Sequence, residues 1–263
     1  MDRLLSENEK LQQAQRAFEA FQAVIGRDGI GRLAEKSMHG VLKFYVDADP
    51  SHHEIPLSEG VVADIFDTKT VTEIQTANYS ALAKKLSRIL DNYAVHVICP
   101  IVKDRYLYLL NEESGAFEGG RKSPVHGSRC HALIAMYDLD RFLTHPNFSI
   151  TFVMLDAAEY KTHFFHKCGR KRTKKLDLVP QRIESTWNVE KREDYLKLLP
   201  EGLPETFTAA QFYKETRLRG RKGSIALKFL RDCELIMQIG KQGNAHIYTL
   251  NKVIKTQTEV QYE

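Results

Sequence analysis

Hydrophobic positions follow helical spacing at the start of the chain and strand spacing after it. Leu11, Ala14 and Phe18 lie three and four residues apart, the spacing of one face of an amphipathic helix. The pattern predicts helices over residues 5–25 and 32–46. Three short β-branched runs separated by polar turns then predict a three-stranded meander, with strands over 53–57, 61–66 and 71–76.

The middle of the chain alternates between the two patterns. It predicts an amphipathic helix over 78–91, buried strands over 95–102 and 105–110, a polar loop over 111–129, a helix over 130–143 and a strand over 149–155. Helices interleaved with apolar strands are typical of an α/β fold, in which helices cover a sheet.

The C-terminal part has a pattern of its own. Short helices are expected over 207–216 and 220–233, and two strand-like runs follow, joined by the turn KQGN. Two helices followed by such a hairpin are typical of a winged helix-turn-helix domain, whose second helix enters the major groove of DNA. The expected organisation is an N-terminal helix (1–27), an α/β domain (28–160), a basic connector (161–189), a winged-helix domain (190–252) and a tail (253–263).

Positive charge is concentrated rather than spread. The chain has 38 Lys and Arg against 34 Asp and Glu, a formal net charge of +4, yet residues 161–182 hold eight Lys or Arg and one Asp. Such a footprint favours contact with a polyanion such as DNA, a solvated loop or a sorting signal being the alternatives. The candidate DNA-binding residues are Arg121, Lys122, Arg170, Lys171, Arg172, Arg221, Lys222 and Lys241.

Several protein classes are disfavoured by composition. No run of about 18 apolar residues occurs, so we expect no transmembrane helix and no membrane partner. The charged N-terminus lacks the apolar core of a signal peptide. Four scattered cysteines without a CxxC pair suit a reducing compartment, so the expected location is the cytoplasm.

Acidic side chains converge on the predicted meander. If residues 67–70 form a four-residue turn, Asp64 lies directly opposite Glu73. Gln75 then shares the face of Glu73, and a turn in the segment SEG places Glu54 opposite Asp64. Opposed like charges destabilise a sheet, and a divalent cation such as Mg²⁺ would explain them. An exposed edge with ordinary acidic side chains is the alternative, and a one-residue slip would separate the faces.

The meander also resembles a known nuclease motif. Asp64, a gap of eight residues and then Glu73-Ile74-Gln75 resemble the D…(D/E)xK signature of the PD-(D/E)xK, or restriction-endonuclease-like, superfamily. Glu35 is similar to a helix glutamate that many members add, and the element order resembles their αβββαβ core. The resemblance implies a nuclease-like domain over 28–160, with Asp64, Glu73 and Glu35 as ligands of Mg²⁺ or Mn²⁺, Glu54 as a further candidate ligand, and Gln75 as the water-orienting catalytic residue.

The chain resembles, more narrowly, an uncharacterised bacterial family. The resembling stretches, over about residues 33–250, are EKSMHGVLKFY, VADIF, TEIQTANYSAL, RKSP, LTHPNF, LPEGLPETFT and GKQGNAHIY. Since the function of that family is unclear, this resemblance implies fold rather than activity.

Gln75 departs from the superfamily pattern, because lysine is usual there. A neutral amide can orient water but supplies no positive charge, although similar ExQ variants occur among resembling active nucleases. Lys36 or Lys43, near Glu35, could supply the missing cation. His39 shares a helix face with Glu35, and a hydrogen-bonded structural histidine is the favoured interpretation there.

These features predict a metal-dependent DNA endonuclease, which would commonly act as a homodimer when it cuts both strands. One alternative is a catalytically inactive DNA-binding or regulatory protein on a nuclease scaffold, suggested by the glutamine. The other is a protein-interaction adaptor, which explains the winged helix but neither the clustered carboxylates nor the basic segment.

Overall fold

A large mixed sheet forms the centre of the molecule in the computed structural model, which describes residues 6–24, 36–58, 60–165 and 169–251. The described elements are α1 (Glu7–Val24), α2 (Ser37–Val46), η1 (Pro50–His52), β1 (His53–Pro56), β2 (Val62–Phe66), β3 (Thr70–Ile74), α3 (Tyr79–Ile89), β4 (Ala94–Leu110), β5 (Phe117–Lys122), η2 (Arg129–His131), α4 (Ala132–Leu139), η3 (Asp140–Phe142), β6 (Phe148–Phe165), β7 (Lys171–Asn188), η4 (Arg192–Leu198), β8 (Thr206–Thr208), α5 (Ala209–Thr216), α6 (Arg221–Asp232), β9 (Ile236–Gln242) and β10 (Ala245–Leu250). The expected mixed α/β class is confirmed.

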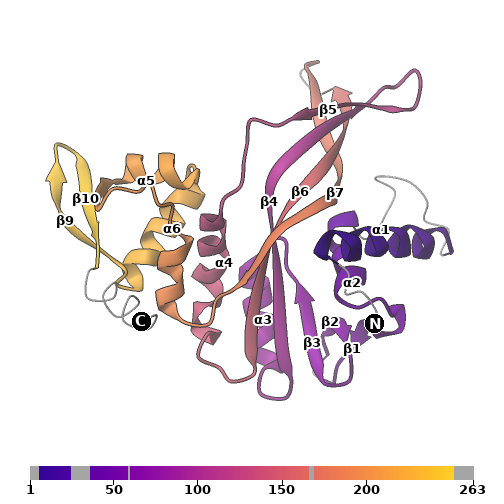
Figure 1. Cartoon of the computed structure of the whole chain (residues 1–263), viewed down its shortest axis with the longest axis horizontal. Helices are drawn as coiled ribbons and strands as arrows, with labels where there is room; N and C mark the ends of the chain where they lie inside the picture. Colours follow the sequence, from indigo (N-terminus) through magenta and orange to yellow (C-terminus); the bar gives the residue numbers. More distant parts are fainter. Residues whose placement is uncertain (1–5, 25–35, 59, 166–168, 252–263) are drawn as a thin grey trace.

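The central sheet is covered by helices on both faces. Its strand order is β1-β2-β3-β4-β6-β7, with β5 paired to β4, and Figure 1 shows α1 and α2 on one side and α3 and α4 on the other. The central strands are apolar on both faces for this reason. On β6, Phe152 packs into the core with α3 and α4, whereas the next residue, Val153, packs into the core with α1 and α2.

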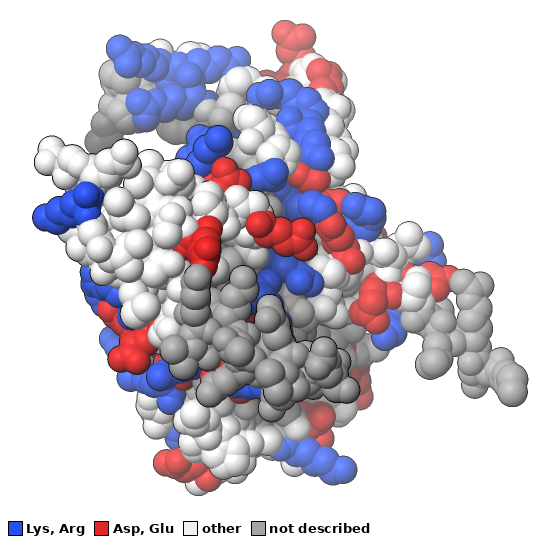
Figure 2. Space-filling model, turned by 60° about the vertical axis from the view of Figure 1, so that its left-hand side comes forward, with Lys and Arg blue, Asp and Glu red and all other residues white. Residues whose placement is uncertain are grey.

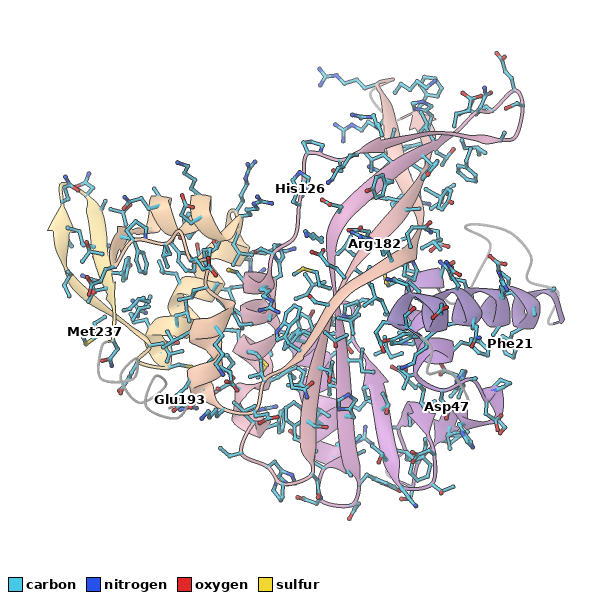
Figure 3. All side chains as sticks on the ribbon, in the orientation of Figure 1. Phe21, Asp47, His126, Arg182, Glu193 and Met237 are labelled. Carbon is cyan, nitrogen blue, oxygen red and sulfur yellow. The ribbon has the colours of Figure 1, made fainter. Side chains whose placement is uncertain are left out.

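Helices α1 and α2 pack closely against each other. Phe21 of α1 lies 5.7 Å from Phe44 of α2 between ring centroids (Figure 3), and Gly40 lets the ring of Phe18 approach the α2 backbone. The buried carboxylate of Asp177, on β7, accepts hydrogen bonds from the backbone and hydroxyl groups of Ser37 at the start of α2. These contacts fix α2, which carries His39, against the sheet.

The meander has the register that the turn lengths predict. Ile65 lies opposite Thr72 on β3, and on β1 His53 lies opposite Ile65 while Ile55 lies opposite Ala63. β3 then continues through α3 to β4, which runs parallel to it. The acidic positions of the three strands are therefore brought to one region of the sheet.

The largest difference from expectation concerns the basic segment. Residues 161–189 were expected to form a connector, but of the described residues in this range 161–165 are the end of β6 and 171–188 are β7, and the two strands pair antiparallel from Phe165 opposite Lys171 to Thr151 opposite Asn188. The expected loop over 111–129 likewise contains β5, and the strands expected over 95–102 and 105–110 are one strand, β4. Charged side chains at the exposed ends of long strands hid the strand pattern in the sequence.

The long strands extend beyond the helices as an arm (Figure 1). Pairing of β4 with β6 ends at Leu109 opposite Lys161. Beyond this pair, β6 and β7 continue as a two-stranded ribbon of residues 162–165 and 171–174. We call these residues the β6–β7 ribbon.

The C-terminal part consists of α5, α6 and a three-stranded sheet of order β8-β10-β9. It packs against the central part through α6 and α4, and Phe229 of α6 lies 5.0 Å from Tyr195 and 6.5 Å from Tyr137 of α4 between ring centroids. Both parts therefore share one apolar core. Among the described residues, no helix has the length and apolarity needed to cross a membrane.

Candidate functional site

Three potential metal-ligating side chains meet beside the meander. His39 of α2, Glu54 of β1 and Asp64 of β2 each offer one ligand atom, and these atoms lie within 4.8 Å of one another. The side chain of Glu54 is 57% exposed and forms an ion pair with Lys43, their atoms 2.5 Å apart. The cluster therefore has one solvent-facing carboxylate and a more enclosed imidazole and carboxylate.

Asp64 is the best-held member of this cluster. Its Oδ2 accepts a hydrogen bond from the backbone N–H of Ile74 at 2.7 Å and lies 3.1 Å from Nε2 of His39. Burial raises the pKa of Asp64, but the hydrogen bond and charge of His39, the N–H of Ile74 and the charge of Lys85 together outweigh it, so the pKa lies below its usual value. Asp64 is therefore an ionised carboxylate in a fixed orientation.

Glu73 lies beside this cluster, buried on β3. Burial and then the charge of Asp64 raise the pKa of Glu73 to about 7, while Lys85 of α3 opposes the shift. The Lys85 Nζ lies 2.6 Å from the Glu73 carboxylate. Asp64 and Glu73 are therefore close enough for their charges to interact, but Glu73 pairs with Lys85 of α3 and is not one of the three clustered ligand groups, so the expected sharing of a cation by Asp64 and Glu73 is not seen.

Gln75 and Glu35 have different outcomes. The amide of Gln75, just after β3, donates to the carbonyl of Ala77, so its nitrogen is engaged by the backbone. Glu35 lies outside the described residues, and its expected role stays a prediction.

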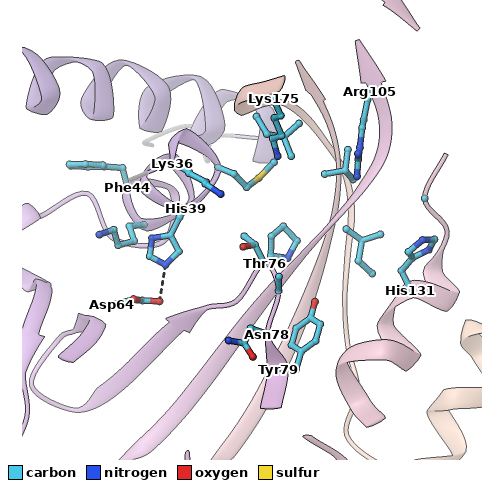
Figure 4. A pocket seen from close by; sticks show the side chains of 18 of the residues that line it. Lys36, His39, Phe44, Asp64, Thr76, Asn78, Tyr79, Arg105, His131 and Lys175 are labelled. Carbon is cyan, nitrogen blue, oxygen red and sulfur yellow. Dashed lines mark hydrogen bonds and ion pairs between the residues drawn. The ribbon is translucent and has the colours of Figure 1, made fainter. Parts of the chain in front are cut away.

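A cleft of about 1350 Å³ extends from the acidic cluster toward the C-terminal part. Its lining includes His39 and Asp64 as well as His131 and Lys222, which belong to η2 and α6. In Figure 4, His39 and Asp64 lie on one side and His131 on the other, with Tyr79 between them on the floor. The cleft therefore joins the acidic cluster to the start of α6.

Positive side chains line the same cleft. Lys36, Arg105, Lys175 and Lys222 all contribute to its walls. Burial lowers the pKa of Lys175, and the nearby charges of Arg105 and Lys36 lower it further against the pull of acidic neighbours. Burial lowers the pKa of His131 to about 4, and the charge of Lys222 adds to this effect. Burial is the main cause of both shifts, and the neighbouring cations add to it, although Arg105 also pairs with Glu159 at 3.4 Å.

The predicted DNA-binding residues do not form one patch. Lys122 of β5 forms an ion pair with Asp104, their atoms 2.7 Å apart, so its charge is already balanced. The remaining candidates are exposed: Arg121 on β5, Arg170, Lys171 and Arg172 at the β6–β7 ribbon, Arg221 and Lys222 at the start of α6, and Lys241 on β9. Figure 2 shows Lys and Arg gathered at the upper end of the molecule, at the height that the strand tips have in Figure 1.

Two residues of the site were missed or underweighted from sequence. For His39 the sequence favours a structural role, and the signal that it could join the acids is the helix face that it shares with Glu35. Lys85 gave no signal, because the helix over 78–91 carries two adjacent lysines and only the packing of α3 selects one of them. The contact of α3 with β3, an internal strand of the sheet, is a tertiary feature.

The chain belongs to the DUF8091 family, a domain of unknown function whose sequence profile matches residues 36–190. An uncharacterized protein of Treponema pallidum (strain Nichols) is 26% identical over 222 residues, which are 83% of this chain and 86% of that protein. No solved structure matches the chain. The family match ends two residues after β7, so it contains the central sheet, the acidic cluster and the arm, but not α5 and α6.

Proposed function

We propose that this protein is a metal-dependent DNA endonuclease on a PD-(D/E)xK scaffold. The observation that carries the proposal is the cluster of His39, Glu54 and Asp64 at the wall of a cleft that several lysines and an arginine also line. Clustered ligands beside positive charge suit phosphodiester hydrolysis, in which a cation and a phosphate occupy adjacent positions.

The topology supports this scaffold. Helix α2, the meander β1–β3, helix α3 and strand β4 follow one another in the order of the αβββαβ core, and β4 lies parallel to β3. The acids lie on the meander, as in the nuclease motif that the sequence resembles. Helices α5 and α6 with β9 and β10 support a winged-helix domain, in which Arg221 and Lys222 would face DNA at the start of the second helix.

The donor set fits a divalent cation of intermediate softness. Two carboxylates suit Mg²⁺ or Mn²⁺, whereas an imidazole is a better ligand for Mn²⁺ than for the strongly oxygen-preferring Mg²⁺. We therefore propose Asp64, Glu54 and His39 as ligands and Mn²⁺ as the more effective ion. A bound cation would lower the pKa of a coordinated water and balance charge on the phosphate.

The protein's own residues would supply the remaining functions. Glu73 and Lys85 form a buried acid–base pair next to Asp64, so Lys85 can provide the positive charge that Gln75 lacks. Neither lysine suggested by the sequence is placed as well: Lys43 is engaged by Glu54, and Lys36 lies with the phosphate-facing cations of the cleft. Cleavage of both strands would require a second copy of the chain, so a homodimer is part of the proposal.

A metal-dependence assay tests this function. Plasmid, linear, branched and single-stranded DNA would be incubated with Mn²⁺, Mg²⁺ or EDTA. We expect cleavage with Mn²⁺, weaker cleavage with Mg²⁺ and none with EDTA. Asp64→Asn should reduce the rate by more than about a hundredfold, since the metal supplies several kcal/mol of stabilisation. Lys85→Met should also reduce it.

Matched variants separate these effects from general damage. Lys84→Met changes the exposed neighbour of Lys85, and Asp91→Asn changes a largely exposed carboxylate that does not line the cleft, so both should leave cleavage unchanged. DNA binding without cleavage by the wild-type chain, with every metal and DNA form, would instead favour the inactive DNA-binding alternative. Absence of both would favour the adaptor.

A further inference from the structure

The β6–β7 ribbon combines exposed aromatic rings with dense positive charge. Phe164 lies opposite Arg172, and Phe165 lies opposite Lys171, so each aromatic side chain has a cationic neighbour across the ribbon. Phe165 is 71% exposed, and Phe164 is 39% exposed. Exposure of a phenylalanine ring to water is unfavourable, so a bound partner that buries the ring would stabilise it. The neighbouring cations make an apolar protein surface unsuitable as that partner.

The two phenylalanines lie on opposite faces of the ribbon. Successive side chains of a strand alternate between faces, and directly opposite residues share a face. Phe165 therefore shares a face with Lys171, Thr173 and Lys175, because the pairing of residues 161–165 with 171–175 contains no register shift. Phe164 shares the other face with Arg172. Since Lys175 lines the cleft, the face with Phe165 continues the cleft wall.

We propose that this ribbon binds duplex DNA and inserts Phe165 as a wedge between two base pairs, while Lys171 beside the wedge and Lys175 nearer the cleft contact the DNA backbone. Proteins that bend DNA use apolar side chains in this way, and the unstacked step kinks the duplex by roughly 20–90°. The proposed wedge has the required parts: an apolar ring at an exposed end, flanking cations, and a ribbon narrow enough to enter a groove.

The separation of Lys171 and Lys175 along β7 gives the distance from the proposed wedge to the cleft. Lys171 and Lys175 are four residues apart on one strand, which corresponds to about 13 Å along the ribbon. This distance equals about four base-pair steps of B-DNA. A duplex with a phosphate at Lys175 would therefore be kinked about four base pairs away, on the side away from the acidic cluster.

This inference rests on the DNA-binding part of the proposed function, but its test does not require cleavage. The full chain would be mixed in EDTA with a duplex of about 25 base pairs labelled at both ends, shorter than the persistence length of DNA, so that energy transfer reports bending. Binding would be measured in parallel as a function of salt. We expect the wild-type chain to increase energy transfer, because a kink brings the two ends together.

The two phenylalanines provide matched variants. Phe165→Ala should remove most of the change in energy transfer and weaken binding roughly 5- to 100-fold, the range for loss of a base-stacking contact. Phe164→Ala should change either quantity by less than about twofold, because its face is directed away from the cleft wall. Lys171→Gln should weaken binding and reduce the slope of log affinity against log salt by about one.

A fluorescent substitution gives an independent readout. In Phe165→Trp, stacking on bases should quench the new tryptophan when duplex is added, whereas in Phe164→Trp it should not. Equal behaviour of the two positions would overturn the wedge. So would tighter binding to a single strand of the same length, or binding of the ribbon to anionic lipid vesicles in preference to duplex. Loss of cleavage alone, with bending retained, would refute the nuclease proposal and leave this inference standing.

Discussion

Glu73 is a buried acid whose ionised form is energetically unfavourable. It is 3% exposed, and burial together with the neighbouring charge of Asp64 raises its pKa to about 7, although Lys85 lies against it. The folded protein therefore binds a proton at Glu73 more tightly than the unfolded chain does. Retention of an acid under these conditions is easier to explain by a cation at the neighbouring cluster than by stability alone.

The pH dependence of stability tests this environment of Glu73. Between the ordinary glutamate pKa of 4.5 and about 7, the folded state holds more protons than the unfolded state, so the free energy of unfolding should fall as pH rises. In EDTA, wild type should lose about 2–3 kcal/mol between pH 5 and 8 relative to Glu73→Gln, whose side chain does not titrate. Urea unfolding at several pH values measures the difference. If the free energy of unfolding of the two proteins changed equally with pH, ionisation of Glu73 would not destabilise the folded state.

Residue-level chemistry was partly predictable from the sequence. Turn lengths gave the correct register, because the two-residue period of strands ties side-chain facing to pairing. That placed Glu54 with Asp64, as expected, whereas Glu73 pairs with Lys85 of α3 and is not one of the clustered ligand groups. His39 and Lys85 lie on helices. The rotation of each helix about its axis and its distance from the sheet depend on tertiary packing, so no local sequence pattern identifies both residues as neighbours of these acids.

At the scale of elements, α2 positions His39 and is itself held by close packing with α1. A Cβ added to Gly40 would lie 2.1 Å from Cε2 of Phe18, closer than atoms tolerate. Gly40→Ala should therefore destabilise the protein by about 1–3 kcal/mol, despite the better helix propensity of alanine. It should also weaken the proposed metal-dependent cleavage, because α2 must move and His39 with it.

The double variant Gly40→Ala, Phe18→Leu is the control for this clash. Leucine is smaller than the ring, so the second change should cost less in the alanine background than in wild type, which urea unfolding of all four proteins would measure. Strict additivity of the two changes would contradict the close contact between the helices.

Element boundaries show where sequence reasoning failed. The helices over 78–91, 207–216 and 220–233 were found close to their expected ranges, since their amphipathic patterns are regular. Strand β7 was expected as a connector, because its first residues lie in the arm and have no buried face to impose alternation on the sequence, whereas Leu178 and Ile183 in its second half are buried. The arm is therefore a feature that only pairing with β6 reveals.

At the scale of the whole molecule, the C-terminal part and the central sheet share a core although the family match ends near the last strand of the sheet. Phe229 of α6 is 4% exposed and packs against Tyr195 and Tyr137. The single tryptophan, Trp187 of β7, stacks on Phe152 at 5.7 Å between ring centroids and so reports on the sheet. A shared core implies that the two parts unfold together, which keeps Lys222 in a fixed position across the cleft.

We therefore predict that a change in α6 shifts the unfolding of the sheet. Phe229→Ala should lower the free energy of unfolding by about 3–5 kcal/mol, since it leaves a cavity in the core. The urea midpoint from Trp187 fluorescence should fall together with the midpoint from far-ultraviolet circular dichroism. Met237→Ala, at an exposed apolar residue of β9, should leave both midpoints nearly unchanged. If Phe229→Ala moved the dichroism transition but not that of Trp187, the C-terminal part would unfold independently, and the cleft would join two separately stable bodies.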